Sequence, residues 1–142
     1  MKFNINIIVG GVENVPIYLV DAARIVRTEL KKTFENFEIA ALYKLDICLC
    51  FSGNTSKYYS KSGVYQPRYY LKTKKFIVSI HFSPEEWSLH RKEDEWKFLE
   101  MYQNYLLELS TIMKKKMEDN KLEFDESRCQ DTIKKIFLNL RI

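Results

Sequence analysis

The sequence predicts an α+β fold: a mainly antiparallel sheet of about four strands with helices packed on one face, in the order β-α-β-β-β-α-α. Four short runs alternate apolar and polar residues, with the period of two that is typical of strands. Three longer runs repeat apolar residues every three or four positions, as on one face of a helix. The 142 residues suffice for one hydrophobic core, so we expect a single domain over residues 1–142.

The first two expected elements are a strand and a helix. Apolar side chains alternate over residues 3–9, and Gly10-Gly11 ends the run. From Pro16 to Phe34 the apolar period becomes helical, and proline suits a first helical turn because its missing N–H has no partner there. Residues 37–43 fit either a backward extension of the next strand or a separate crossing, and the sequence leaves both open.

Three further strands are expected over residues 45–51, 64–72 and 75–82. The middle one contains Pro67, which cannot donate a hydrogen bond to a neighbouring strand, so this strand should lie at a sheet edge or carry a bulge. Thr73-Lys74 is expected to join it to the last strand as a hairpin.

Two helices are expected to complete the chain. Ser83-Pro84-Glu85-Glu86 combines an N-cap serine, a proline in the first turn and a glutamate three residues after the serine, which predicts a helix running to about Met117. Asp125 is a candidate N-cap for the last helix. Phe124 and Cys129, on either side of that cap, are spaced to form a hydrophobic staple.

Charge and cysteine content indicate a cytoplasmic protein with no membrane partner. The formal net charge is +4, which permits an acidic partner without requiring one. No apolar run approaches the ~18 residues of a membrane span, and Asn4 and Asn6 interrupt the N-terminal run too early for a signal peptide. The three cysteines are an odd number, which cannot form a closed disulfide framework.

No motif in the sequence fixes a reaction, so we expect no enzyme, no cofactor and no metal. Cys48, Cys50 and His81 could share one face of the sheet, but the Cys-x-Cys spacing lacks the longer gap of a zinc knuckle. The consecutive carboxylates at 93–95 would spread around a helix and not pair as an acid and a base.

Residues 57–75 form an unusual segment that is basic and rich in tyrosine. It holds six cations, five of the nine tyrosines and no acidic residue. Tyrosine and arginine are enriched at the centres of protein interfaces, and the same side chains can stack on bases and contact phosphates. The alternatives are therefore a protein-binding site, an RNA or single-stranded nucleic-acid site, or a structural hairpin with half-buried tyrosines. The partner-binding candidates are Tyr58, Tyr59, Tyr65, Arg68 and Tyr70.

The run LDICLCFSGNTSKYYSKSGVYQPRYYLKTKKFIVSIHFSPEEW, residues 45–87, and the long aromatic helix expected after it resemble one class of protein. They are similar to small cytoplasmic immunity proteins of bacterial polymorphic toxin systems, including contact-dependent growth inhibition. The resemblance implies a protein without catalytic activity that binds a cognate toxin C-terminal domain, a nuclease being one option. Binding would block the active site of the toxin or the access of its substrate.

The positive charge departs from one expectation of this resemblance, because immunity proteins against basic nucleases are often acidic. Either the toxin presents an acidic face, or the contact uses acidic side chains near the predicted helix start. The residues of this second set are Glu85, Glu86, Glu93, Asp94 and Glu95.

Overall fold

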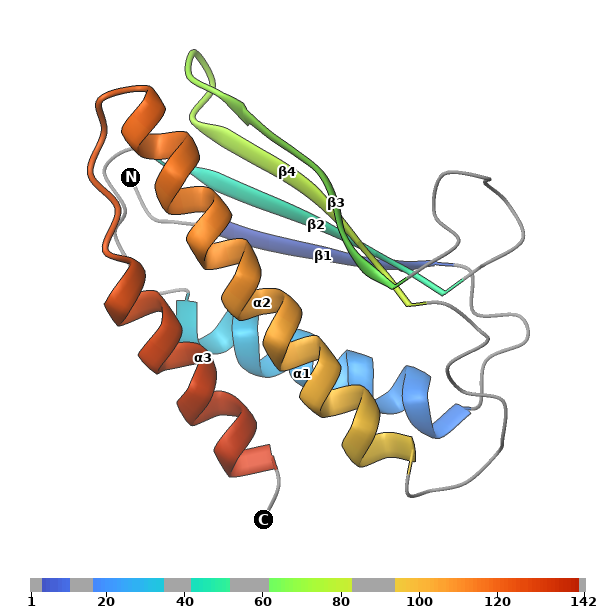
Figure 1. Cartoon of the computed structure of the whole chain (residues 1–142). Coiled ribbons are helices and arrows are strands. Elements are labelled where there is room, and N and C mark those ends of the chain that lie inside the picture. The colour runs from blue at the N-terminus through green and yellow to red at the C-terminus, as the bar shows by residue number, and fades with distance from the viewer. Residues whose placement is uncertain (1–3, 11–16, 35–41, 52–61, 83–93, 141–142) are drawn as a thin grey trace.

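A computed structural model describes residues 4–10, 17–34, 42–51, 62–82 and 94–140. These residues form a four-stranded sheet with three helices on one of its faces (Figure 1). The elements are β1 (Asn4–Gly10), α1 (Ile17–Phe34), β2 (Lys44–Cys50), β3 (Gly63–Tyr70), β4 (Lys75–His81), α2 (Asp94–Asp119) and α3 (Glu126–Leu140). The predicted order of elements is confirmed.

The prediction of a mainly antiparallel sheet is wrong. The strands lie in the order β1-β2-β4-β3, with β1, β2 and β4 parallel and only β3 antiparallel to β4. Helix α1 carries the chain back along the sheet between β1 and β2, so the two strands point the same way. The β3–β4 hairpin then places β4, and not β3, beside β2. Apolar alternation is compatible with either strand direction, which is why the sequence did not show this arrangement.

The helix-covered face of the sheet forms the core. On the three parallel strands the inward side chains of Ile5, Ile47 and Val78 are each at most 5% exposed, and the helices cover them. At the end of β4 the core continues as an aromatic cluster. The Phe82 ring lies 4.8 Å from that of Phe98, a residue of the α2 helix. Such a cluster joins the sheet to α2 by burying large rings against one another.

The ends of α2 and α3 are fixed by local hydrogen bonds. The N–H of Lys121, which has a φ of 60°, donates to the Glu118 carbonyl, and the Leu122 N–H donates to that of Met117. This is the Schellman pattern that ends a helix. At the start of α3 the Arg128 N–H donates to Asp125 Oδ1 at 3.0 Å, which confirms the predicted N-cap. The capping box predicted at 83–86 lies outside the described residues.

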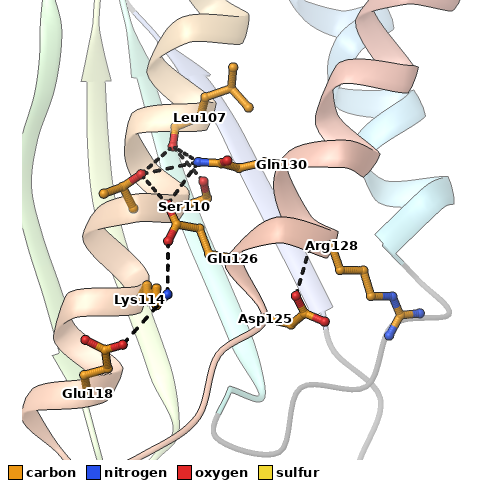
Figure 2. A network of polar contacts seen from close by, with 9 residues as sticks. Leu107, Ser110, Lys114, Glu118, Asp125, Glu126, Arg128 and Gln130 are labelled. Carbon is orange, nitrogen blue, oxygen red and sulfur yellow. Dashed lines mark hydrogen bonds and ion pairs between the residues drawn. The ribbon is translucent and has the colours of Figure 1, made fainter.

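Polar contacts also tie α3 to α2 (Figure 2). Thr111 Oγ1 on α2 donates to Glu126 Oε1 at 2.7 Å, and Gln130 Nε2 donates to the same oxygen at 3.1 Å. Lys114 Nζ lies 3.6 Å from the other oxygen of Glu126. Phe124 and Cys129, the residues of the predicted staple, both line a cavity of ≈ 30 Å³ in the apolar core. These polar contacts hold α2 and α3 together behind the sheet.

Candidate partner-binding site

The face of the sheet away from the helices is not covered by any helix or strand that the structure describes (Figure 1). Strand register arranges its side chains in four rows that cross the sheet. In the order β1-β2-β4-β3 the rows are Asn4–Lys44–Lys75–Tyr70, Asn6–Asp46–Ile77–Arg68, Ile8–Cys48–Ser79–Tyr65 and Gly10–Cys50–His81–Gly63. We call this surface the open face.

A β-bulge in β3 decides which of its residues reach the open face. Tyr65 pairs with Ser79 and Arg68 pairs with Ile77, so three steps along β3 match two steps along β4. The additional residue reverses the alternation of side chains. Gln66, inside the bulge, has a φ of 49°, and Pro67 follows it at the sheet edge, as its missing N–H predicts.

The bulge therefore brings three of the predicted partner-binding residues onto one surface. Tyr65 is half-buried, and its ring lies edge-on to that of His81 at 6.4 Å. Arg68 is exposed, and Tyr70 is 43% exposed at the far end of the strand. The other two candidates, Tyr58 and Tyr59, lie outside the described residues.

One carboxylate lies among the cations of the open face. Asp46 Oδ2 is 3.1 Å from Lys75 Nζ, and Asp46 Oδ1 is 3.8 Å from Lys44 Nζ. One negative charge thus faces two positive ones. Arg68 makes no ion pair with any described residue, so the open face keeps a positive excess.

The acidic candidates belong to a different part of the molecule. Asp94 and Glu95 begin α2, which packs on the helix-covered side of the sheet. The remaining acidic candidates, Glu85, Glu86 and Glu93, lie outside the described residues. The structure therefore does not join Asp94 and Glu95 to the tyrosines and arginine of β3 in one site.

Cysteine and histidine side chains do share the open face, as the spacing predicted. Cys50 and His81 are direct partners in the β2–β4 register, and Cys48 lies one row away. Among the described residues, however, no three histidine, cysteine or acidic side chains are grouped to hold a metal ion. Burial and the neighbouring Cys50 raise the pKa of the Cys48 thiol, and a protonated thiol is a poor nucleophile.

Two exposed residues at or beside the β3–β4 turn were not singled out in the sequence analysis. Leu71, in the β3–β4 turn, is 53% exposed, and Tyr43, just before β2, is 44% exposed. The Tyr43 N–H donates to the Lys74 carbonyl of the same turn at 2.7 Å, so the backbone of Tyr43 lies against that turn. A large apolar residue within a turn is a sequence signal of an exposed binding surface, since turn residues lie beyond the sheet and its helices do not cover them.

Fold and surface together define a helix-backed sheet domain with an open, basic and aromatic face. The sequence model of the family described as Immunity protein 12 matches residues 4–133, and the chain belongs to this family. The predicted resemblance to immunity proteins of bacterial polymorphic toxin systems is thereby confirmed. Comparison with curated proteins and with solved structures gave no match. Within the described ranges, no helix is both long and apolar enough to cross a membrane.

Proposed function

We propose that this immunity protein neutralises a cognate toxin by binding its C-terminal domain through the open face. Binding blocks the active site of the toxin or the access of its substrate, in the cytoplasm, with no cofactor and no reaction of its own. The observation that carries the proposal is the bulge in β3, which presents Tyr65, Arg68 and Tyr70 together on an uncovered surface. The family membership supplies the class of partner.

The three side chains are of the kind that provides tight binding. A toxin acts catalytically, so an inhibitor must bind it tightly, and affinity in protein interfaces is concentrated in a few desolvated aromatic or arginine residues. Tyr65 already packs against His81, so its ring loses little freedom when a partner covers it. Arg68 and Tyr70 are exposed and available to a partner.

The test uses the cognate toxin domain, to be sought in the gene directly upstream, purified as a complex with this protein, separated in denaturant and refolded. Kinetics of association and dissociation are measured for the parent and for alanine variants of the five candidates. We expect at least one of Tyr58→Ala, Tyr59→Ala and Arg68→Ala to weaken binding by ~2 kcal/mol or more. Arg24→Ala, at an exposed position on α1, is the matched control and should bind as the parent does.

Two results would contradict the proposal. A parent protein that neither binds the toxin domain nor protects cells expressing it would refute the function itself. Hairpin variants that all bind like the parent, while Glu95→Lys abolishes binding, would show that the contact lies at the start of α2. In that case the function would stand and the site would be wrong.

A further inference from the structure

The positive excess of the described chain resides in the sheet. The three helices and the α2–α3 connection carry twelve acidic and twelve basic residues, so their charges balance. The four strands and the β3–β4 turn carry five cations and a single acid, Asp46. A positive potential therefore extends from the open face and its turn, and not from the helical layer.

Most of these cations gather at one end of the sheet, where β3 turns into β4. Lys72 and Lys74 lie in the turn, and Lys75 lies beside Lys44 in the first row of the open face. Lys72 and Lys74 make no ion pair with a described residue, so their charges are not compensated within the described chain.

Large apolar side chains are exposed at this same end. Tyr70 belongs to the row of Lys44 and Lys75, and Leu71 follows it in the turn. Tyr43 is bound to the turn through the Lys74 carbonyl. Two strand spacings, about 10 Å, separate β2 from β3, so Tyr43 and Tyr70 fit within one ordinary interface. We call the exposed residues Tyr43, Tyr70, Leu71 and Lys72, together with the half-buried Lys74, the turn-end patch.

The patch has the composition of an interface centre with a charged rim. Exposed aromatic and aliphatic side chains provide apolar surface that becomes buried on binding. The surrounding lysines set the association rate with an oppositely charged surface. A second copy of this chain would bring the same positive charges against themselves, which disfavours self-association through this patch. A phosphate backbone crossing the open face would meet the Asp46 carboxylate, which favours a protein partner over a nucleic acid.

We infer that the toxin presents an acidic surface, and that this surface docks on the turn-end patch with Tyr70 and Leu71 at the centre of the contact. The inference rests on the proposed function and extends it, because it specifies the chemistry of the partner. It also moves the centre of the contact from Tyr58 and Tyr59, which precede β3 in the sequence, to the turn that follows β3.

The experiment compares two double charge reversals in the kinetic assay with the refolded toxin domain. Arg68→Glu with Lys72→Glu changes the sheet side, and Lys115→Glu with Lys134→Glu makes the same change of charge on exposed positions of α2 and α3. Association is followed at about 50, 150 and 300 mM NaCl, which spans strong and weak screening. Asp46→Asn, which removes the one acid of the surface, is measured alongside.

We expect the sheet-side double variant to associate about tenfold or more slowly at low salt, and the helix-side double variant to change less than about threefold. Parent association should slow as salt rises, and Asp46→Asn should associate faster than the parent. Tyr70→Ala and Leu71→Ala should instead raise the dissociation rate, about tenfold for at least one of them.

Other outcomes overturn the inference in distinguishable ways. Equal effects of the two double variants, or parent association that is indifferent to salt, would remove the acidic partner surface while leaving the immunity function intact. Equally tight binding of a 20-nucleotide single-stranded RNA, lost in the sheet-side variant, would assign the patch to nucleic acid. No binding of the toxin domain by the parent would refute the proposed function together with this inference.

Discussion

Replacing Tyr102 by phenylalanine should stabilise the protein. Tyr102 lies on α2, is 0% exposed, and packs against Phe82, Phe98 and Phe137 with ring centroids 5.8 Å apart in each pair. Its hydroxyl group is buried and has no hydrogen-bond partner among the described residues. Phenylalanine keeps every ring contact and removes only the oxygen.

The expected gain follows from the cost of a buried polar group without a partner, which is about 1–3 kcal/mol. Part of that gain is offset by the small space that the missing oxygen leaves, so we expect about 1 kcal/mol of additional stability. For a chain of this size, that corresponds to a rise of roughly 2–4 °C in melting temperature.

A second readout is the dependence of stability on pH. Burial raises the pKa of Tyr102, with the nearby Arg27 charge opposing part of that effect. Above about pH 10 the unfolded tyrosine ionises while the folded one stays protonated, so the parent loses stability as the pH rises. Phenylalanine does not ionise, and the advantage of the variant should grow by up to about 1.4 kcal/mol per pH unit there.

The assay is urea unfolding of the parent, Tyr102→Phe and the control Tyr43→Phe, at neutral pH and again above pH 10. Tyr43 is 44% exposed, so its hydroxyl group stays in water and its variant should differ from the parent by less than about 0.5 kcal/mol. A loss of about 1 kcal/mol or more in Tyr102→Phe would show that the hydroxyl group is hydrogen-bonded, and our reasoning about this site would be wrong.

Three further predictions concern the core, a helix end and a thiol. Phe82→Ala should lower the free energy of unfolding in urea by about 3–5 kcal/mol, because it empties the centre of the aromatic cluster. Leu138→Ala, at a 63% exposed position, should lower it by less than about 0.5 kcal/mol. Similar losses of stability in the two variants would contradict the packing described for Phe82. Lys121→Gly should raise stability by about 0.5–1 kcal/mol, measured the same way, because glycine adopts the φ of 60° without strain; a decrease would argue against this helix end. Burial, followed by the charges of Asp125 and Glu126, raises the pKa of Cys129 to about 12, so iodoacetamide at pH 8 should label Cys129 only after unfolding. Rapid labelling of native Cys129, detected by mass spectrometry, would refute this.

Local chemistry made several features of this protein predictable. Periodicity predicted the type and order of the elements because side-chain spacing follows directly from backbone geometry. Pro67 predicted an edge or bulged strand because it lacks the N–H that a central strand must donate. Asp125 predicted the start of α3 because its carboxylate can accept a hydrogen bond from a free N–H of the first turn.

The candidate site was predictable only as a composition. The sequence shows that residues 57–75 combine cations with tyrosines, but not which of them share a surface. Tyr65 and Arg68 are three positions apart, and regular alternation would place them on opposite faces of β3. They share the open face because the bulge adds one residue between them. That residue is additional only relative to β4, where the paired residues Ser79 and Ile77 are two positions apart.

The sequence by itself determined the elements, their order, the end of β1 at Gly10, the start of α3 after Asp125, and the family. Only the tertiary structure decided the directions and order of the strands, the single face shared by Tyr65, Arg68 and Tyr70, and the approach of Tyr43 to the turn before Lys75. The physical reason is the range of the interactions. Helix periods and caps depend on neighbours within about four residues, which one stretch of sequence contains. Strand pairing depends on backbone hydrogen bonds between distant segments, and those bonds are equally available to many registers and to both directions.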